Sequence, residues 1–364
     1  MATHTAIATT AKGHFDAVQM PTQTMPPAGS VLIEVAYASM VAFDTYITDL
    51  GLGITEYPVV LGLNVAGTVK AVGAGEKRLQ VGDQITGFSI YSGGNKDGLQ
   101  GTLQEYLVLP SYLCATIPPT LSLPEAATIP DNFITSFYTL FDQLSLPIPS
   151  TFPASTPPSN PGIPILIYGA GATNGQYAIQ LLHLAGYTNI LATASPRHHA
   201  LIRSLGAAHV FDYRSPTLTA DVKAVAKNGV ELALDAVTAD STIARIAPLM
   251  SPTGSIALLL PIKVGDAVAV GDAGMRWELP AEVNPLAAGT KINYVRTFLF
   301  DKNEYLKEHL MPQILPQLLR DGLIQPNKVR LLDQGTLKER VGAGLELLRS
   351  NAISGEKIIV KVSQ

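Results

Sequence analysis

The sequence contains a single cysteine, Cys114, among its 364 residues. One thiol excludes a disulfide framework and every structural zinc site that needs several thiolates. The seven histidines show no His-x-x-x-His or comparable spacing that would supply the missing ligands. Cys114 lies among apolar neighbours with no basic residue beside it, so we assign it no chemistry. We therefore expect a cytoplasmic protein that holds no metal.

Charged side chains are also scarce. Asp, Glu, Lys and Arg make up 15% of the chain, and the formal net charge is -4, whereas about 25% is typical of globular domains. No cluster of lysine and arginine marks a surface for nucleic acid or anionic lipid, and no apolar run reaches the roughly 18 residues of a membrane span. We expect small neutral ligands, no nucleic-acid or membrane partner, and a monomer or small homo-oligomer.

The chain changes character after its first third. Residues 1–130 are predicted to be mostly β, because glycine and proline punctuate short runs in which Val31, Ile33, Val35 and Tyr37 alternate on one face. Further along, apolar runs alternate with helical stretches; the predicted strands are 165–168, 190–194, 210–211, 232–237 and 256–260. This alternation predicts an α/β fold, a doubly wound parallel sheet of the Rossmann type beside a β-rich domain.

Between these regions, residues 147–164 hold seven prolines in eighteen residues. Such a composition cannot form a helix or a central strand, so we expect an exposed, mobile loop. Two interpretations stay open: a tolerated surface insertion, or a docking loop for a partner protein.

A glycine-rich turn follows the apolar run 165–168 and precedes a helical pattern. Glycines there let the backbone approach a pyrophosphate, whose charge is favoured at the start of the helix. The pattern is one residue longer than the standard fingerprint, and a turn selected for packing is the alternative. The cofactor-binding residues predicted from this turn are Gly169, Gly171, Ala172, Thr173, Asn174 and Gly175.

The end of the next predicted strand favours NADPH over NADH. NAD sites usually place an Asp or Glu there for the ribose 2′-hydroxyl, but this chain has Ser195, Arg197 and His198. A hydroxyl, a guanidinium and an imidazole suit a 2′-phosphate. Alternatively, Arg197 and the histidines only line the start of a helix, and for His199 this is the simpler interpretation.

An ordered series of motifs resembles the zinc-free quinone oxidoreductase and enoyl reductase branch of the medium-chain dehydrogenase/reductase superfamily. These motifs are Asp44-Thr45-Tyr46-Ile47, Gly62-Leu63-Asn64, Val81-Gly82-Asp83, Gly101-Thr102-Leu103, Leu123-Pro124-Glu125, the glycine turn, and Gly355-Glu356-Lys357. The segments 194–198, 204–207 and 210–214 look especially like fungal trans-acting enoyl reductases.

The resemblance implies a GroES-like substrate domain built from both chain ends around a central Rossmann domain whose cleft holds the nicotinamide. The expected boundaries are 1–130, 131–295 and 296–364. Zinc alcohol dehydrogenases of the superfamily carry Gly-His-Glu where this chain has Gly62-Leu63-Asn64, and a cysteine near Met40. Leucine and methionine cannot complete a zinc site, which disfavours alcohol oxidation.

The resemblance also assigns roles to individual residues. It places Tyr46 beside the nicotinamide, as proton donor or substrate-orienting hydroxyl, unless its ring only packs in the core. Asp44 either orients Tyr46 or caps a helix. Thr135 falls on the helix that contacts the cofactor, unless its hydroxyl bonds to its own backbone. Tyr213 resembles the family position beside the adenosine 2′-phosphate, unless it is only an aromatic residue at a strand edge.

The expected reaction is NADPH-dependent reduction of an activated carbon–carbon double bond, because an α,β-unsaturated carbonyl accepts hydride without a metal. The substrate would be a small apolar enone or an enoyl thioester, free or bound to a carrier protein of a synthase in secondary metabolism. Quinone reduction and a catalytically silent NADPH-binding scaffold are the alternatives. Trp277, Phe298 and Phe300 either line the substrate cleft or pack in a core.

Overall fold

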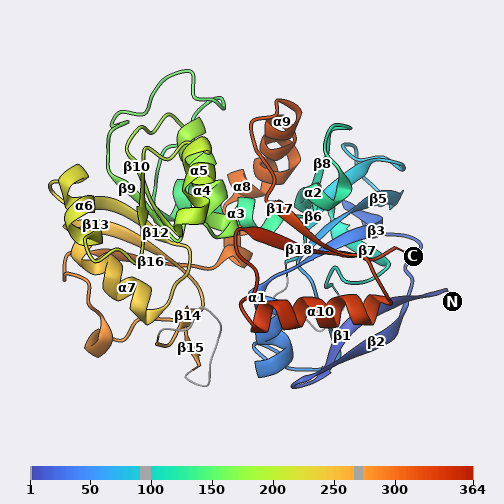
Figure 1. Cartoon of the computed structure of the whole chain (residues 1–364). Helices are drawn as coiled ribbons and strands as arrows, with labels where there is room; N and C mark the ends of the chain where they lie inside the picture. The colour runs from blue at the N-terminus through green and yellow to red at the C-terminus, as the bar shows by residue number, and fades with distance from the viewer. Residues whose placement is uncertain (1, 91–99, 266–273, 364) are drawn as a thin grey trace. The chain divides into compact units, whose positions relative to one another are not determined.

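Two compact units divide the chain in the computed structural model, which describes residues 2–90, 100–265 and 274–363. Unit 1 comprises Met1–Asp131 and Phe298–Gln364, and unit 2 comprises Asn132–Thr297 (Figure 1). Unit 1 is therefore assembled from both ends of the chain, whereas unit 2 is one continuous segment.

Unit 1 is built on two β-sheets. The larger sheet has the order β17-β18-β3-β5-β6-β8, with β7 also paired to β3, and the smaller has the order β2-β1-β4. Only β17 and β18 pair in parallel in the larger sheet. The strands are β1 (Thr3–Ala11), β2 (His14–Pro21), β3 (Ser30–Met40), β4 (Val59–Val60), β5 (Asn64–Val72), β6 (Gln84–Phe88), β7 (Tyr106–Pro110), β8 (Cys114–Thr116), β17 (Lys328–Leu332) and β18 (Glu356–Lys361).

The alternation predicted for β3 ends part-way along the strand. Val31, Ile33 and Val35 are buried, but the pairing of β3 with β5 shifts register between Val35 and Tyr37. Tyr37 consequently pairs with Ala66 and packs, half-buried, against a separate small cluster. The prediction that all four side chains share one face is wrong for Tyr37, because the bulge reverses the side on which it lies.

Short helices complete unit 1. They are α1 (Ala42–Thr45), η1 (Tyr46–Leu50), η2 (Ser111–Leu113), α2 (Leu123–Ala126), α8 (Glu304–His309), η8 (Leu310–Ile314), α9 (Leu315–Arg320) and α10 (Leu337–Arg349). Two further helices, α3 (Pro130–Tyr138) and η7 (Thr297–Lys302), each include residues of both units. Within α10, Thr336 and Glu339 form a capping box that fixes the start of the helix.

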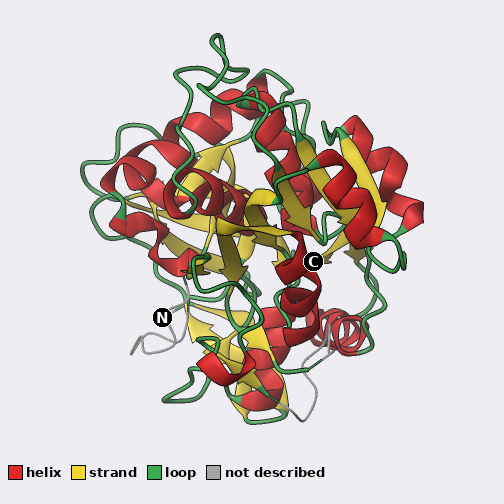
Figure 2. Cartoon of the chain, turned by 90° about the vertical axis from the view of Figure 1, so that its left-hand side faces the viewer, coloured by secondary structure: helices red, strands yellow, loops and turns green. Residues whose placement is uncertain are grey.

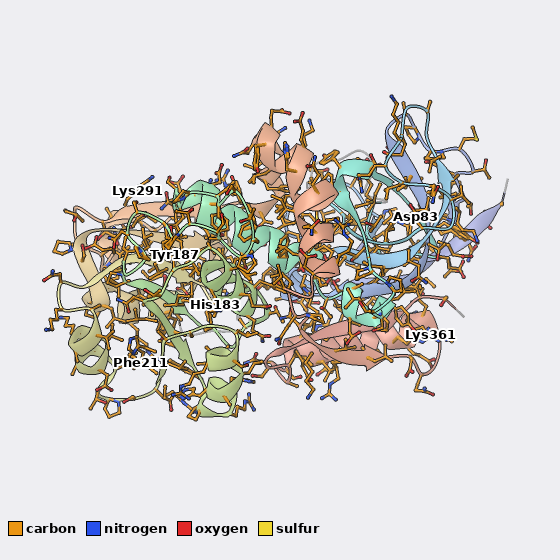
Figure 3. The ribbon with its side chains drawn as sticks, turned by 90° about the horizontal axis from the view of Figure 1, so that it is seen from above. Asp83, His183, Tyr187, Phe211, Lys291 and Lys361 are labelled. Carbon is orange, nitrogen blue, oxygen red and sulfur yellow. The ribbon has the colours of Figure 1, made fainter. Side chains whose placement is uncertain are left out.

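Unit 2 contains a six-stranded parallel sheet with the order β11-β10-β9-β12-β13-β16. Figure 2 shows its strands in yellow with red helices beside them, and Figure 3 labels Phe211 and Lys291 on its two edge strands. The strands are β9 (Ile165–Tyr168), β10 (Ile190–Ala194), β11 (His209–Asp212), β12 (Val230–Asp235), β13 (Met250–Leu259) and β16 (Lys291–Val295), besides the hairpin β14 (Ile262–Lys263) and β15 (Met275–Arg276). The order reverses between β9 and β12, as in dinucleotide-binding folds, and confirms the predicted fold class.

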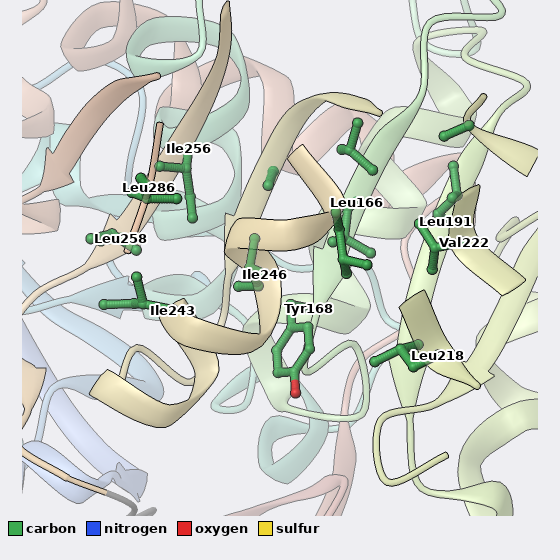
Figure 4. Packing of buried hydrophobic residues seen from close by; sticks show 14 of the residues in the cluster. Leu166, Tyr168, Leu191, Leu218, Val222, Ile243, Ile246, Ile256, Leu258 and Leu286 are labelled. Atoms are coloured by element: carbon green, nitrogen blue, oxygen red, sulfur yellow. The ribbon is translucent and has the colours of Figure 1, made fainter. Parts of the chain in front are cut away.

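Helices connect the strands of unit 2. They are η3 (Thr139–Gln143), α4 (Thr173–Leu184), η4 (Pro196–His198), α5 (His199–Ser204), α6 (Leu218–Val225), α7 (Asp240–Ile246), η5 (Ala247–Leu249) and η6 (Ala281–Val283). Leu218 and Val222 from α6, with Ile243 and Ile246 from α7, pack on the sheet in one buried cluster (Figure 4). This burial stabilises the sheet and fixes the ends of its strands, where a ligand would bind.

The proline-rich segment 147–164 follows a defined course. Most of its residues are exposed, as expected, but the Phe152 ring packs 6.1 Å from the rings of Phe137 and Phe141, measured between centroids. The Ala154 N–H donates to the Leu184 carbonyl, and the Thr188 N–H donates to the Pro161 carbonyl. The expectation of a mobile loop therefore needs correction, because aromatic packing and backbone hydrogen bonds anchor the segment on unit 2.

Two further predictions concern the single cysteine and membrane-spanning segments. Cys114 is fully buried, and burial raises the pKa of its thiol to about 12, so it stays protonated at neutral pH. Across the described parts of the chain, no helix is long and apolar enough to cross a membrane.

Candidate active site

The glycine turn of unit 2 joins β9 to α4 and lies against β10. Gly169 has a φ of +78°, which a side chain would strain, and its N–H donates to Thr193 Oγ1 at 3.0 Å. The Ala170 N–H donates to the Thr193 carbonyl at 2.8 Å. A Cβ atom at Gly175 would lie only 2.8 Å from Ala170 Cα, so the helix starts close against the turn.

The start of α4 favours an anion. Its N-cap residue is Ala172, which has no side-chain oxygen to accept from the first amides, and no acidic residue lies in its first turn. The Asn174 side chain accepts from the neighbouring Gly175 N–H at 2.9 Å. The helix dipole and the close backbone approach at Gly169 and Gly175 together fit the pyrophosphate of a nicotinamide dinucleotide.

Ser195 and His198 lie beside this turn. Ser195 is the N-cap of η4, which directly follows β10. A Cβ atom at Gly171 would lie 3.1 Å from Cδ2 of His198, so the imidazole ring is next to the glycine turn. Partial burial, with Arg197 and His199 nearby, lowers the pKa of His198. The Arg197 side chain is exposed, and His199 Nε2 contacts the Ala194 carbonyl at 3.0 Å.

Tyr213 follows the neighbouring strand at the same edge of the sheet. Ala194 of β10 pairs with Asp212 of β11, so the residues after them leave the sheet side by side. The guanidinium of Arg214 lies 5.3 Å from the centroid of the Tyr213 ring, and Arg214 Nε pairs with Asp212 Oδ1 at 3.2 Å. Sequence reasoning missed Arg214 as a second cation here, although its place directly after Tyr213 was a usable signal.

Thr135 lies on α3 in unit 2. Its hydroxyl is 2.9 Å from the Thr297 hydroxyl, so it does not bond to its own helix backbone. One turn later, the Thr139 hydroxyl donates to the Thr135 carbonyl at 2.6 Å. A hydroxyl bond of this kind to the helix backbone was the alternative for Thr135, but here Thr139 makes it. The Thr135 hydroxyl therefore contacts the start of η7 rather than the backbone of α3.

Tyr46 is the first residue of η1, a π-helical turn that continues α1 in unit 1. Such turns are rare and are frequent at functional sites. The side chain is 7% exposed, and burial alone raises the pKa of its hydroxyl to about 12. The ring packs edge-on against Phe43, yet the hydroxyl has no hydrogen-bond partner among the residues that the structure describes.

Asp44 joins two segments of unit 1. Its Oδ2 accepts from the Val41 N–H, and its Oδ1 accepts from the Gly62 N–H, each at 2.7 Å. The first bond caps α1, and the second ties that helix to the turn before β5. Burial raises the pKa of Asp44 to about 6, against the lowering effect of the two amides and of Lys357. The carboxylate therefore fixes the segment that carries Tyr46 and does not contact its hydroxyl.

The residues at the zinc positions of alcohol dehydrogenases do not fit a metal. Leu63 has no donor atom, and the Asn64 amide is fully engaged: its Nδ2 donates to the Ala127 carbonyl and to Asp131 Oδ1, while its Oδ1 accepts from the Asp131 N–H. Met40 packs against Gly344, where an added Cβ atom would collide with its sulfur. Within the described ranges, no group of three or more His, Cys, Asp or Glu side chains could hold a metal ion.

Models of two protein families match the chain: an alcohol dehydrogenase GroES-like domain over residues 27–119, and a zinc-binding dehydrogenase over residues 175–260. The first range lies in unit 1 and the second in unit 2. A trans-enoyl reductase of Gibberella fujikuroi is 31% identical over 339 residues, which cover 92% of this chain and 91% of that protein. The chain belongs to the fungal trans-enoyl reductase family. It is therefore an oxidoreductase of the medium-chain dehydrogenase/reductase superfamily, whose cofactor is a nicotinamide dinucleotide.

Other members of the trans-enoyl reductase family extend the comparison. The enoyl reductase component lovC of the lovastatin nonaketide synthase from Aspergillus terreus is 30% identical over 303 residues, covering 83% of this chain and 81% of that protein. The crystal structure of the CurK enoyl reductase has the same fold, with a TM-score of 0.74 and 22% identity over 98% of this chain and 99% of that one. These comparisons do not favour the quinone reductase or the silent scaffold.

Proposed function

We propose that the protein is an NADPH-dependent reductase that adds hydride to the β-carbon of an α,β-unsaturated thioester or ketone. Its membership of the trans-enoyl reductase family carries this proposal. The glycine turn, with Gly169, Gly171 and Gly175, would hold the pyrophosphate, and Ala172, Thr173 and Asn174 would present the start of α4 to it. When bound, the cofactor supplies the hydride.

The residues after β10 and β11 support NADPH rather than NADH as the proposed cofactor. Ser195, Arg197 and His198 offer a hydroxyl, a guanidinium and an imidazole in place of the carboxylate of an NAD site. Tyr213 and Arg214 add an aromatic face and a second cation at the same sheet edge. The acid at this edge, Asp212, is already paired with Arg214.

Tyr46 supplies the acid chemistry in this proposal. Hydride arriving at the β-carbon moves the electrons of the double bond onto the carbonyl oxygen, and the enolate is then protonated at the α-carbon. A phenol whose pKa is about 12 is neutral at pH 7 and can donate a hydrogen bond or a proton. Because its hydroxyl is not engaged by the described residues, it is available to a substrate. Thr135 is proposed to position the nicotinamide.

The preferred substrate in this proposal is an enoyl chain on the phosphopantetheine arm of a carrier protein. The relative from Aspergillus terreus is by name a component of a polyketide-type synthase. Comparing one enoyl group on a carrier protein and on free pantetheine tests the point. A similar kcat/KM for the two forms would restrict the proposal to free thioesters.

The reaction itself is tested with NADPH deuterated at C4 and an enoyl thioester such as the crotonyl group on pantetheine. We expect NADPH consumption and a saturated product with deuterium at the β-carbon, detected by mass spectrometry and NMR. A quinone supplied in parallel distinguishes the alternative chemistry. NADPH consumption with quinones and none with any enone or enoyl thioester would contradict the proposal.

A further inference from the structure

The backbone of the glycine turn is largely engaged by the protein itself. The N–H groups of Gly169 and Ala170 donate to Thr193 on β10, at 3.0 Å and 2.8 Å. The Ala172 N–H donates to the Gly169 carbonyl at 2.9 Å. Gly171 is the exception, because its N–H has no acceptor among the residues that the structure describes. An anion at the start of a helix is bound by backbone N–H groups, so the Gly171 N–H is the donor that these four residues leave for it.

The side chain of Gln176 holds the carbonyl group of this same glycine. Gln176 lies in α4 and is only 4% exposed, and its Nε2 donates to the Gly171 carbonyl at 3.1 Å. Burying a side-chain amide is costly unless it is hydrogen-bonded. Its bond to the turn meets that need. The buried amide therefore restrains the residue whose N–H is left for a ligand.

Ser136 anchors the start of α4 from a second helix. It lies on α3, is fully buried, and donates its hydroxyl to the Asn174 carbonyl at 2.7 Å. Both residues belong to unit 2, so the bond lies within one compact unit. In the sequence, Gly171 and Asn174 flank Ala172, the N-cap of α4. Two buried side chains thus hold the backbone just before and just after the point where the helix begins.

We propose that Gln176 and Ser136 are positioning residues for the cofactor: they hold Gly171 and the first turn of α4 in the geometry that binds the pyrophosphate. This inference rests on the pyrophosphate site of the proposed function. A glycine rotates easily because it has no side chain, and a carbonyl oxygen turned toward a phosphate repels it. The Gln176 amide holds that carbonyl before the cofactor arrives, so less ordering is needed on binding.

The first test replaces Gln176 by methionine, an unbranched side chain of similar length that has no N–H donor. We expect the Kd for NADPH to rise about 3- to 10-fold, the range for one lost hydrogen bond between neutral groups. The Kd for NADH should rise by the same factor, because both cofactors contain the pyrophosphate. Gln180→Met is the matched control and should change neither Kd. Gln180 is 5% exposed, and its Nε2 donates to the Gln176 carbonyl at 3.4 Å, within α4 itself.

Two fragments of the cofactor show whether the effect lies at the pyrophosphate. The fragment 2′-phospho-ADP-ribose contains the pyrophosphate, whereas adenosine 2′-phosphate lacks it. Isothermal titration should show that Gln176→Met weakens binding of the first by the same factor as NADPH and leaves the second unchanged. A general loosening of unit 2 would weaken both. Equal losses for the two fragments would therefore overturn the proposal, and so would an unchanged Kd for NADPH.

Ser136→Ala tests the second contact by removing a single oxygen atom. The same pattern is expected: weaker binding of NADPH and 2′-phospho-ADP-ribose, and unchanged binding of adenosine 2′-phosphate. Circular dichroism and thermal unfolding establish that each variant is folded. If Gln176→Met does not fold, Ser136→Ala decides the matter, and the absence of a selective loss in that variant would refute the proposal.

These binding measurements need no substrate, so they separate the inference from the proposed reaction. Selective losses in the variants, with no turnover of any enoyl thioester by the wild type, would refute the reaction and support the inference. Turnover by the wild type, with losses in the variants that are absent or unselective, would refute only the inference. In an active enzyme, Gln176→Met should raise the KM for NADPH and leave kcat at saturating NADPH unchanged.

Discussion

Tyr46 combines a buried ring with a hydroxyl that no described residue engages. Buried tyrosines usually find a partner for the hydroxyl, so this one is available to a ligand. The sequence alone could not decide between a packed ring and a reactive phenol, because the decision depends on which groups surround the oxygen in three dimensions. The π-helical turn that starts at Tyr46 likewise leaves no pattern in the sequence.

Replacing Tyr46 by phenylalanine should separate binding from chemistry. We expect kcat for enoyl reduction to fall by about 10²-fold or more, the typical contribution of a positioned proton donor, while the Kd for NADPH stays within about twofold of wild type. Steady-state kinetics and fluorescence titration measure the two quantities. Tyr305→Phe, at an exposed tyrosine of α8, is the matched control. An unchanged kcat would remove Tyr46 as the obligatory donor.

Arg197 gives a prediction for cofactor selectivity. Arg197→Ala should weaken NADPH binding by about 10- to 100-fold, because a hydrogen bond to a charged group contributes about 1.5–3 kcal/mol, and should leave NADH binding nearly unchanged. Isothermal titration with both cofactors measures the ratio. Arg203→Ala, at an exposed arginine of α5, is the control. Equal losses for NADH and NADPH would show that Arg197 does not bind the 2′-phosphate.

The buried ion pair of Asp131 and Lys357 shows the limit of sequence reasoning at the residue scale. Asn64 and Asp131 are 67 positions apart, and Asp131 and Lys357 are 226 apart. In the sequence alone, Asn64 is explained by a turn, Asp131 by the start of a helix and Lys357 by a strand. No local spacing indicates that the three side chains meet, because their contact depends on the sheet pairing.

Among the elements, strand–turn–helix from β9 to α4 was predictable because periodicity and glycine spacing are local signals. The anchoring of the proline-rich segment was not, since it depends on the Phe152 ring reaching α3 and η3. The end of the alternation in β3 was also invisible, because a bulge is decided by the partner strand.

Gly175 gives a prediction for the packing of α4 on the turn. Gly175→Ala should lower the free energy of unfolding by about 1–3 kcal/mol, the usual cost of overpacking, and weaken NADPH binding, because backbone atoms of Gly169 and Ala170 block the added methyl group. Denaturant unfolding and cofactor titration measure the effects. Gly162→Ala, where a Cβ atom would meet nothing within 4 Å, should be close to neutral. Similar effects of both substitutions would argue against close packing as the cause.

Over the whole chain, unit 1 depends on a strand from the far end of the sequence. β18 lies between β17 and β3 in the larger sheet, and its residues 358–360 are almost fully buried. The fold class was predictable from the alternating pattern of the middle segment and from the ordered motifs, since both are properties of the linear sequence. The pairing partners of β18 were not.

Deletion of residues 356–364 should prevent unit 1 from folding. The deletion removes the hydrogen bonds of β18 to β3 and β17 and the cation that compensates Asp131. We expect an insoluble product, or a soluble one that lacks the unfolding transition of unit 1 in calorimetry. A truncated protein with the wild-type transitions would show that the rest of the sheet suffices.

Assembly of one unit from both chain ends sets an order for synthesis. Asp131 and Lys357 are separated by 226 residues. Because ribosomes add about 5–20 residues per second, Lys357 is synthesised roughly 10 to 45 seconds after Asp131. By then unit 2 has been fully synthesised, but residues 37–40 of β3 still lack β18, their partner on one side. Unpaired edges invite aggregation. During synthesis, the strands of residues 1–131 therefore leave one edge of the larger sheet open until β18 has been translated.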